Sequence, residues 1–387
     1  MLNYLKNIKL RLQFTGWLQY ILPVVVAIFF LGIAGLFGVL NFLNLSYVFL
    51  TISVLLFTIT LFDITTIKFN IRPTESLPRR RDDMDAFDLM RTRRSCRSFQ
   101  NRKLKPSDYS ELLNVVREVN HQNNNKIGHN PIRFEYINAP LTVWPVVGAQ
   151  EFFVAIAPKN YSRQSIVDVG RNLQKVVHHA TKMGLGTCWI GPGADQSSIA
   201  QHLGDQFNSE KDHIVCVCAI GYKSWFTPFF LRIMASVVQH RRLPISSLFF
   251  TDYQFKKPLD EKVAPFDRFG RCYEVCQWAP SSFNSQTTRC VAVKEITNEE
   301  HRNGNTIPAK KSEIKLKRFD FYTSTKSRFY SPVALGIWFA NWEIGCEALG
   351  IKGHFEILSE NDRSVSTMGK VSELPIYDVS WVLDEAN

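Results

Sequence analysis

The hydrophobic pattern divides the chain into a long apolar stretch near the N-terminus and a remainder of ordinary amphipathic segments. Residues 12–62 contain no Asp, Glu, Lys or Arg, and apolar side chains dominate them. This stretch is too long for one transmembrane helix, because ~20 apolar residues cross about 30 Å of hydrocarbon. We therefore expect two membrane-spanning helices, over residues 17–40 and 45–62, joined by a turn near Asn41. Three glycines are expected to let these helices approach closely: Gly32, Gly35 and Gly38.

The charges beside the apolar stretch predict its orientation. Lys6, Lys9 and Arg11 precede it, and Lys68 and Arg72 follow it, whereas the turn between the two helices carries no charge. Because basic flanks stay on the cytosolic side of a membrane, we expect both termini and the following domain to be cytosolic. A cleaved signal peptide and a pair of buried helices in a soluble protein are the alternatives.

Beyond the apolar stretch, the pattern predicts one polar linker and two similar runs of strand and helix. Residues 71–85 are polar, contain two prolines and lack apolar periodicity, which favours a linker. A helix is expected over residues 105–119, with Ser107 or Asp108 as its N-cap. The remaining expected elements are, in order, strand 151–158, helix 167–186, strand 213–222, strand 319–325, helix 332–350 and strand 374–383.

Glycine positions in these two runs indicate an internal duplication. Gly170 and Gly184 in the first run match Gly336 and Gly350 in the second at the same offset along the chain. Each half alone is short of a complete core, so we expect the two halves to pack together as an intrachain pseudo-dimer. The predicted division is residues 1–70 for the hairpin, 71–87 for the linker, 88–244 for the first half and 245–387 for the second.

The distribution of charge argues against a nucleic-acid-binding protein, and the cysteine spacing argues against a metal site. The formal net charge is +11, but the basic residues are scattered, and the densest run, Arg79 to Arg81, is followed at once by Asp82 and Asp83. We therefore expect no nucleic-acid partner. The eight cysteines lie mostly in apolar stretches and include no Cys-x-x-Cys pair, so we expect buried, reduced thiols and no metal site.

Two motifs offer side-chain donors. One cluster places three guanidinium groups and a hydroxyl within five residues, an arrangement suited to a phosphate monoester: Arg93, Arg94, Ser95 and Arg97. The other is the loop 278–286, which supplies short hydrogen-bonding groups behind a rigid proline: Pro280, Ser281, Ser282 and Asn284. A solvated basic turn and a helix-capping turn are the respective structural alternatives.

Two further motifs lie in the first half. In residues 183–193 a predicted helix ends at glycine, and a glycine-rich turn then exposes backbone N–H groups near Thr187, Ile190 and Gly191. This motif is not a P-loop, because the Gly-Lys-Ser/Thr ending is absent. In residues 240–244, His-Arg-Arg-Leu-Pro, Arg241 or Arg242 offers further positive charge for a phosphate.

In this order the four motifs resemble the nitroreductase-like FMN-dependent oxidoreductase family, particularly the branch whose single chain contains both half-domains. The resemblance covers about residues 88–383. It implies an α+β nitroreductase-like fold of two half-domains, here preceded by an α-helical transmembrane hairpin. It also implies that the FMN phosphate and ribityl end are held by Arg93, Arg94, Ser95, Arg97 and Arg242.

The resemblance further implies a site composed from both halves. The family's Pro-Ser-Ser-x-Asn loop reaches FMN from the opposite subunit, and its match here is Pro280, Ser281, Ser282 and Asn284 in the second half of the same chain. Thr187, Ile190 and Gly191 match the segment that contacts the flavin N5 and O4.

Several features depart from the usual family pattern. The first half lacks the Pro-Ser-Ser pattern near residues 117–125, and the second half lacks the Arg-Arg-Ser-x-Arg pattern, so we expect one composite site per chain and a degenerate second site. The insert 224–240 is aromatic and apolar, and a lid, a membrane-resting helix and core packing are all open interpretations.

The implied activity is hydride transfer from NAD(P)H through flavin N5 to an electron-poor acceptor of nitroaromatic or quinone type. No catalytic side chain is expected, because the flavin performs the chemistry. His178 and His179 lie in the middle of a predicted helix and are interpreted as packing or surface residues. A catalytically decayed membrane scaffold and a reductive dehalogenase are the alternative functions.

Overall fold

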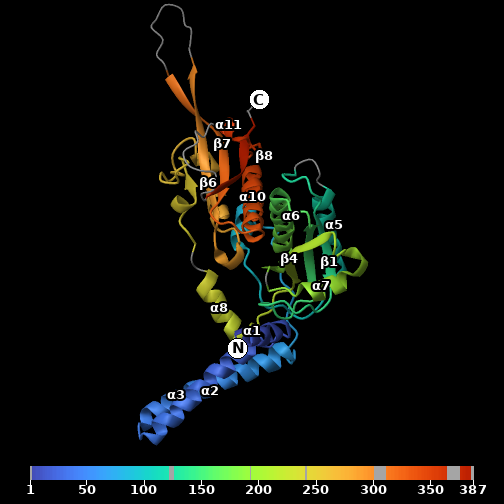
Figure 1. The fold of residues 1–387 in the computed structure, drawn as a ribbon, viewed down its shortest axis with the longest axis vertical. Coiled ribbons are helices and arrows are strands. Elements are labelled where there is room, and N and C mark those ends of the chain that lie inside the picture. Colours follow the sequence, from blue (N-terminus) through green and yellow to red (C-terminus); the bar gives the residue numbers. More distant parts are fainter. Residues whose placement is uncertain are drawn as a thin grey trace, which may run out of the picture.

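The structure is a computed structural model of the whole chain. It describes residues 2–121, 126–191, 193–239, 242–299, 311–363 and 375–384. Figure 1 shows two lobes of sheet and helix side by side, with a hairpin of two long helices projecting from one end.

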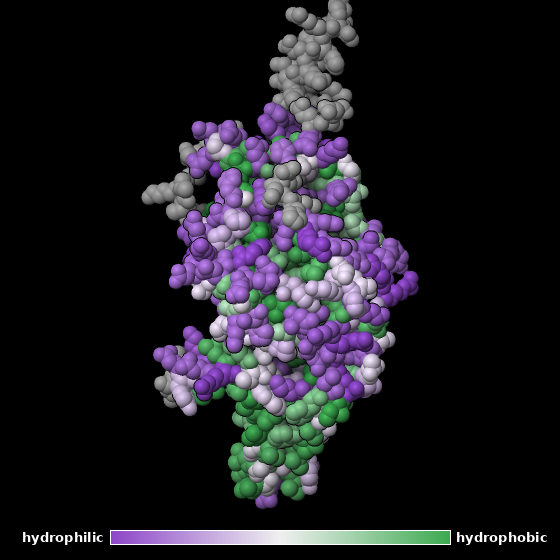
Figure 2. All heavy atoms as spheres, turned by 90° about the vertical axis from the view of Figure 1, so that its right-hand side faces the viewer, coloured by the Kyte–Doolittle hydropathy of each residue, from purple (hydrophilic) through white to green (hydrophobic). Residues whose placement is uncertain are grey.

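The hairpin forms where the apolar stretch predicts it. Helices α2 (Leu18–Val39) and α3 (Leu43–Asp63) run antiparallel after a short first helix, α1 (Leu2–Phe14), and α3 continues as the π-helical turn η1 (Ile64–Lys68). Asn41 turns the chain with a positive φ of 62°. Both long helices are apolar and long enough to cross a membrane. Figure 2 shows hydrophobic side chains over the surface of the hairpin and mostly polar ones above it.

Alanine and serine side chains form the contact between α2 and α3. Ala27 and Ala34 are buried against the facing helix. The Ser53 hydroxyl donates a hydrogen bond to the carbonyl oxygen of Ala27 at 2.8 Å, and that of Ser46 donates to Ala34, also at 2.8 Å. These bonds join the two helices inside an otherwise apolar surface.

The prediction that glycines form this contact is wrong for Gly32 and Gly35. An added Cβ at either position would meet no atom within 4 Å, whereas one at Gly38 would lie 3.5 Å from the Ser46 hydroxyl oxygen. The reason is helical geometry. At 3.6 residues per turn, Gly38 shares the face of Ala34, while Gly32 and Gly35 point elsewhere.

The first lobe is an antiparallel sheet with helices against it. Its strand order is β1-β2-β4-β3. The strands are β1 (Arg133–Asn138), β2 (Glu151–Pro158), β3 (Gly186–Ile190) and β4 (Asp212–Gly221). Helices α5 (Pro106–His121), α6 (Arg163–Lys182) and α7 (Gln196–Leu203) pack against this sheet. Helix α4 (Ala86–Thr92) lies between the two lobes, and α8 (Phe229–Gln239) lies beside the hairpin. Because α5 begins at Pro106, Ser107 and Asp108 lie inside its first turn and are not its N-cap.

The second lobe repeats this arrangement. Its sheet has the order β5-β6-β7-β9-β8, in which the last four strands follow the order of the first sheet and β5 adds a parallel edge. The strands are β5 (Phe249–Phe250), β6 (Thr288–Glu299), β7 (Lys311–Thr323), β8 (Gly353–Glu356) and β9 (Ile376–Leu383). The helices are α9 (Cys272–Gln277), α10 (Tyr330–Ala348) and α11 (Glu360–Arg363).

The two lobes pack through equivalent helices, α6 and α10. A Cβ added to Gly170 would lie 2.1 Å from the carbonyl oxygen of Val333, and one added to Gly336 would lie 1.9 Å from that of Val167. Only glycine permits this approach of the two backbones. Gly170 and Gly336, one of the two duplicated glycine pairs, therefore meet at the contact between the halves, whereas Gly184 and Gly350 lie away from it.

Segment 71–85 has no regular secondary structure, as expected of a linker, yet it is attached to the first lobe. The Arg81 N–H donates to the carbonyl oxygen of Lys182 at 2.7 Å. The Arg80 guanidinium binds both carboxylate oxygens of Glu111, at 2.9 and 3.0 Å. The segment thus fixes the hairpin to the lobe instead of separating them.

All eight cysteines are buried and free, as the sequence predicts. Several lie in the aromatic core of the second lobe, where Cys272 and Cys276 pack with Phe269, Phe319 and Trp342. In such surroundings they act as small hydrophobic side chains.

Candidate functional site

A cavity lies between the two halves. It encloses about 1150 Å³ of space, open solvent at its mouth included. The first half contributes Arg93, Arg94, Ser95, Arg97, Pro145, Cys188, Trp189, Ile190, Gly191, Val215, Cys216 and Arg242. The second half contributes Trp278, Pro280, Ser281, Ser282, Phe283, Asn284, Phe329, Tyr330, Val333, Ala334 and Ile337. Three of the four sequence motifs and Arg242 of the fourth therefore meet at one site.

The end of α4 and the edge strand β3 position the arginine cluster. The chain leaves α4 at Thr92 and runs beside β3, where Ser95 and Thr187 form a parallel bridge. The Cys96 N–H donates to the carbonyl oxygen of Thr187 at 2.8 Å. Thr187 is itself buried and is not among the cavity-lining residues, so it supports the cluster from behind.

Several guanidinium donors of this cluster have no hydrogen-bond partner within the described part of the chain. They are buried nitrogens of three arginines: Arg93 Nη1, Arg97 Nε, Arg97 Nη1 and Arg242 Nε. The described lining residues include no Asp or Glu. Buried donors without partners are costly, so such a group of donors fits an anionic ligand.

The positive charges of these arginines repel one another. Burial lowers the pKa of Arg93 to about 10, and the neighbouring positive charge of Arg242 adds to this effect. Burial likewise lowers the pKa of Arg242 to about 10, with contributions from Arg94 and Arg91. A bound phosphate would relieve both the desolvation and the repulsion.

Trp278 holds the arginines in place from the second half. The guanidinium carbons of Arg91, Arg94 and Arg242 lie 3.6, 4.9 and 5.3 Å from the centroid of its ring. Arg242 Nη1 also donates to the carbonyl oxygen of Ala279 at 3.0 Å. Cation–π contacts of this kind leave the remaining guanidinium edges available to a ligand.

The loop after Trp278 has an unusual backbone. Phe283, Asn284 and Gln286 adopt positive φ angles of 53°, 55° and 47°. The Ser281 hydroxyl accepts a hydrogen bond from the Gln286 N–H at 3.0 Å, and the Ser281 carbonyl accepts one from Asn284, also at 3.0 Å. Left-handed conformations of non-glycine residues concentrate at functional sites, where surrounding contacts maintain them.

The turn after β3 forms another wall. Ile190 and Gly191 line the cavity, and their contact with the flavin N5 and O4 stays a prediction. A Cβ at Gly191 would lie 3.2 Å from Cε1 of Tyr330, so a glycine keeps this wall close to the second half. Arg241, the other candidate beside Arg242, lies outside the described residues.

Sequence reasoning missed the walls formed by α10 and by β3 and β4. Phe329 and Tyr330 lie at the start of α10 and Ile337 further along it, and Trp189 and Cys216 come from the sheet. These are apolar or aromatic residues in segments that also build the core. No local polar motif distinguishes them from ordinary core positions.

A buried polar chain lies behind Trp189. The Trp189 Nε1–H donates to Gln174 Oε1 at 3.2 Å, and Gln174 Nε2 lies 3.1 Å from His178 Nε2. His178 Nε2 is also 2.8 Å from Asn341 Oδ1 on α10. Burial lowers the pKa of His178 to about 4, so its imidazole is neutral near pH 7. The interpretation of His178 as a packing residue therefore agrees with its position.

A family model described as "Putative TM nitroreductase" matches residues 85–337. The chain belongs to this nitroreductase family. The match covers well over half of the chain and contains all four motifs, and the nitroreductase fold follows from it. A comparison with curated proteins gave no match.

Solved structures of nitroreductase family proteins are similar to this chain. One from Thermotoga maritima has 16% identity and a TM-score of 0.44, and the alignment covers 80% of this chain and 99% of that one. A nitroreductase with bound FMN from Bacteroides fragilis has 14% identity, a TM-score of 0.30 and coverages of 36% and 90%. Another with bound FMN, from Desulfitobacterium hafniense, has 15% identity, a TM-score of 0.30 and coverages of 38% and 93%.

Proposed function

We propose that this chain is a membrane-anchored FMN-dependent oxidoreductase that carries hydride from NAD(P)H to an electron-poor acceptor of quinone or nitroaromatic type. Membership of the nitroreductase family supports an oxidoreductase. The observation that carries the cofactor assignment is the set of buried guanidinium nitrogens of Arg93, Arg97 and Arg242 at the cavity that have no partner among the described residues. They offer charge-assisted donors to a phosphate, and FMN ends in one.

The other walls of the cavity fit the remainder of FMN. Ser281, Ser282 and Asn284 supply polar groups from the second half, suited to the hydroxyls of a ribityl chain. Ile190 and Gly191 offer backbone groups opposite, and Trp189 and Ile337 supply apolar surface for a flat ring. The site therefore needs both halves of one chain.

When bound, FMN supplies a ring that accepts and donates hydride at N5. The chain's own residues bind, orient and enclose it. The arginines would hold the phosphate end, the loop at Pro280 would contact the ribityl chain, and the aromatic walls would shield one face of the ring from water. No side chain is assigned a proton-transfer role.

Membrane anchoring is the second part of the proposal. The apolar surfaces of α2 and α3 support it, and the basic residues on both flanks favour cytosolic termini and a cytosolic flavin domain. Extraction of membranes with alkaline carbonate is expected to leave the expressed chain in the pellet. Release of the chain into the supernatant would refute the anchor.

The activity test compares two site variants with a matched control. The purified chain is expected to oxidise NAD(P)H when a quinone or nitro compound is present. Arg93→Ala and Asn284→Gly should each lower kcat/KM strongly, and glycine is chosen for the second because the backbone there has a positive φ.

Arg271→Ala is the control, because Arg271 is 42% exposed and binds Asp88 outside the cavity. It should retain the wild-type rate. Equal rates in all three variants would refute the site. A purified chain that neither holds FMN nor oxidises NAD(P)H would favour the decayed scaffold.

A further inference from the structure

Helix α8 connects the hairpin with the cavity. It lies against α2 and α3 at one side and against the loop Ser282–Asn284 at another. Figure 1 shows it beside the base of the hairpin, running across the direction of α2 and α3. Its last residue, Gln239, precedes the cavity residue Arg242 by three positions. One helix of about 16 Å thus spans from the hairpin to the candidate flavin site.

The N-terminal end of α8 is fixed to the end of the apolar hairpin. The Phe229 N–H donates to Asp63 Oδ2, in the last residue of α3, at 2.7 Å. The ring of Phe226 lies 6.4 Å from that of Phe62. These contacts hold α8 at the level where the uncharged stretch of α3 ends.

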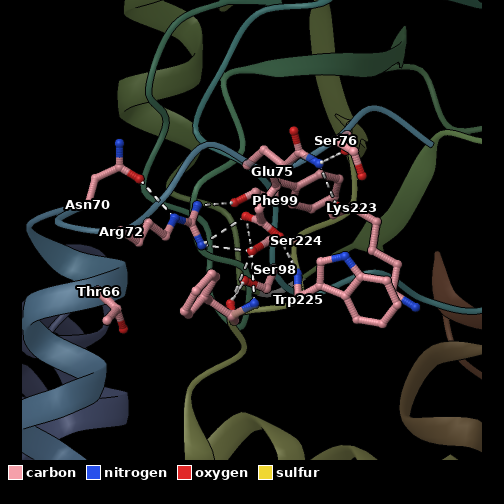
Figure 3. A network of polar contacts seen from close by, with 12 residues as sticks. Thr66, Asn70, Arg72, Glu75, Ser76, Ser98, Phe99, Lys223, Ser224 and Trp225 are labelled. Atoms are coloured by element: carbon pink, nitrogen blue, oxygen red, sulfur yellow. Dashed lines mark hydrogen bonds and ion pairs between the residues drawn. The ribbon is translucent and has the colours of Figure 1, made fainter.

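A buried polar network, drawn in Figure 3, secures the same junction. Arg72 and Glu75 form an ion pair at 3.4 Å with nearly buried side chains. Both also bind the Ser224 hydroxyl, Arg72 at 2.7 Å and Glu75 at 2.8 Å. The Trp225 N–H donates to Glu75 Oε2 at 2.5 Å, while its side chain is 81% exposed. The segment leading into α8 is therefore anchored by its backbone and presents an aromatic side chain outward.

The faces of α8 differ in chemistry. Phe229, Ile233 and Val237 recur every four residues on one face, and Ile233 and Val237 are 47% and 69% exposed. Leu231 is buried on another face. Arg232 and Ser236 are exposed on a polar strip that borders Phe229 and lies roughly 100° around the helix from Ile233 and Val237. An exposed apolar face beside a polar one, next to two apolar helices, is typical of a helix in the plane of a membrane surface.

The apolar surface continues to the cavity. Phe283 lines the cavity, is 79% exposed, and belongs to the loop that contacts α8. The backbone of Phe283 is left-handed, with a φ of 53°. An apolar molecule that moves along the apolar face of α8 therefore meets the exposed side chain of Phe283 at the cavity.

We propose that the apolar face of α8 lies in the lipid surface, and that the acceptor enters the cavity beside α8 from the bilayer. The acceptor class is then a lipid-dissolved quinone. This step rests on the proposed function, in which NAD(P)H, one proton and the quinone give NAD(P)⁺ and the hydroquinone. Lipid is the occupant favoured for this face because the face adjoins the hairpin that the bilayer surrounds.

The lipid contact is tested without reference to activity. The full chain is reconstituted into phosphatidylcholine vesicles with a nitroxide label on Val237→Cys or, as the matched control, on Ser236→Cys. Labelling is selective because all natural cysteines are buried. Oxygen, which concentrates in lipid, should relax the label at 237 most strongly, and a water-soluble nickel complex should relax the label at 236.

Two results would overturn the lipid contact. One is equal access of the nickel complex to both labels, which would mean that the apolar face lies in water. The other is protection of the label at 237 from both reagents, which would indicate a protein partner on this face.

The acceptor route is tested with two quinones, a long-chain one dissolved in the vesicles and a water-soluble one. Val237→Asp should lower kcat/KM several-fold for the long-chain quinone and leave the soluble one unchanged. Ser236→Asp adds the same charge on the polar face and should change neither.

Loss of both activities in Val237→Asp would show a structural role and contradict the route. A wild-type chain that holds FMN and reduces only the soluble quinone would refute the route alone. A chain that reduces neither would refute the proposed function as well, while the label experiment still decides the lipid contact.

Discussion

At the scale of single residues, Arg97 gives the sharpest expectation. Its Nε and Nη1 atoms are buried at the cavity with no partner in the described ranges of the chain. A hydrogen bond to a charged group contributes about 1.5–3 kcal/mol, which corresponds to roughly a 10- to 150-fold change in Kd. Arg97→Ala should weaken FMN binding by this factor in a fluorescence titration. Arg271→Ala should bind as the wild type does, and an unchanged Kd for Arg97→Ala would exclude a phosphate contact.

His178 should make stability depend on pH. Its folded-state pKa is about 4, below the ordinary value of 6.5, because burial disfavours the charged imidazole. Between these values the unfolded chain binds the proton and the folded chain does not, so this contribution is complete above about pH 6.5 and is lost as pH falls to about 4. The loss is roughly 3 kcal/mol. Thermal unfolding of His178→Gln should depend less on pH across this window than the wild type, and equal slopes would contradict the assignment.

The sequence predicts the polar residues that line the cavity but misses most of its apolar walls, for a physical reason. Arginines and a Pro-Ser-Ser-x-Asn loop are rare local combinations, so Arg93 and Ser282 stand out. Trp189 and Tyr330 belong to segments whose apolar side chains build the core as well. Their position at the cavity depends on how the two halves pack against each other. A local sequence pattern carries no information about that packing.

At the scale of elements, the crossing of α6 and α10 determines how the halves meet. A methyl group at Gly336 would lie 1.9 Å from the carbonyl oxygen of Val167, so Gly336→Ala must force the helices apart. Overpacking of this kind costs typically about 1–3 kcal/mol. The midpoint temperature of thermal unfolding, measured on the detergent-solubilised chain, should therefore be lower in Gly336→Ala than in the wild type.

Gly35→Ala is the control for this substitution, because Gly35 is also helical but has open space around it. It should leave the midpoint unchanged or raise it slightly, since alanine favours helix over glycine. A similar fall in both variants would show that helical glycine itself, and not the crossing, accounts for the effect.

Periodicity located most elements closely, and strand 151–158 agrees with β2 at both ends. Helix α6 begins at Arg163, earlier than the expected 167, because Ser162 caps it by accepting from the Ser165 N–H. Strand β7 begins at Lys311, before the expected 319, in a mostly charged stretch whose only apolar residues are Ile314 and Leu316. Hydrophobic periodicity therefore locates the buried part of a helix or strand more accurately than its exposed end.

At the scale of the whole molecule, the junction between hairpin and lobes depends on Glu75. This residue accepts hydrogen bonds from the Ser224 hydroxyl and the Trp225 N–H, far along the chain. Glu75→Ala should speed amide hydrogen exchange in the peptide 224–231, because these groups lose their acceptor.

The exposed Glu210 provides the control for this variant, and Glu210→Ala should leave exchange in that peptide unchanged. Unchanged exchange in Glu75→Ala would mean that the insert is held by other contacts. The sequence predicts a plain linker here, because Arg72 and Glu75 find Ser224 only in the folded chain, about 150 residues away.

The absorption spectrum of the purified full-length chain tests most directly whether each chain holds one composite flavin site built from both halves. We expect an oxidised-flavin spectrum, with about one FMN released per chain on denaturation, and loss of that flavin in Arg93→Ala but not in Arg271→Ala. A colourless protein that binds no added FMN would exclude the site, and a chain that releases two FMN molecules would show that a second site is intact.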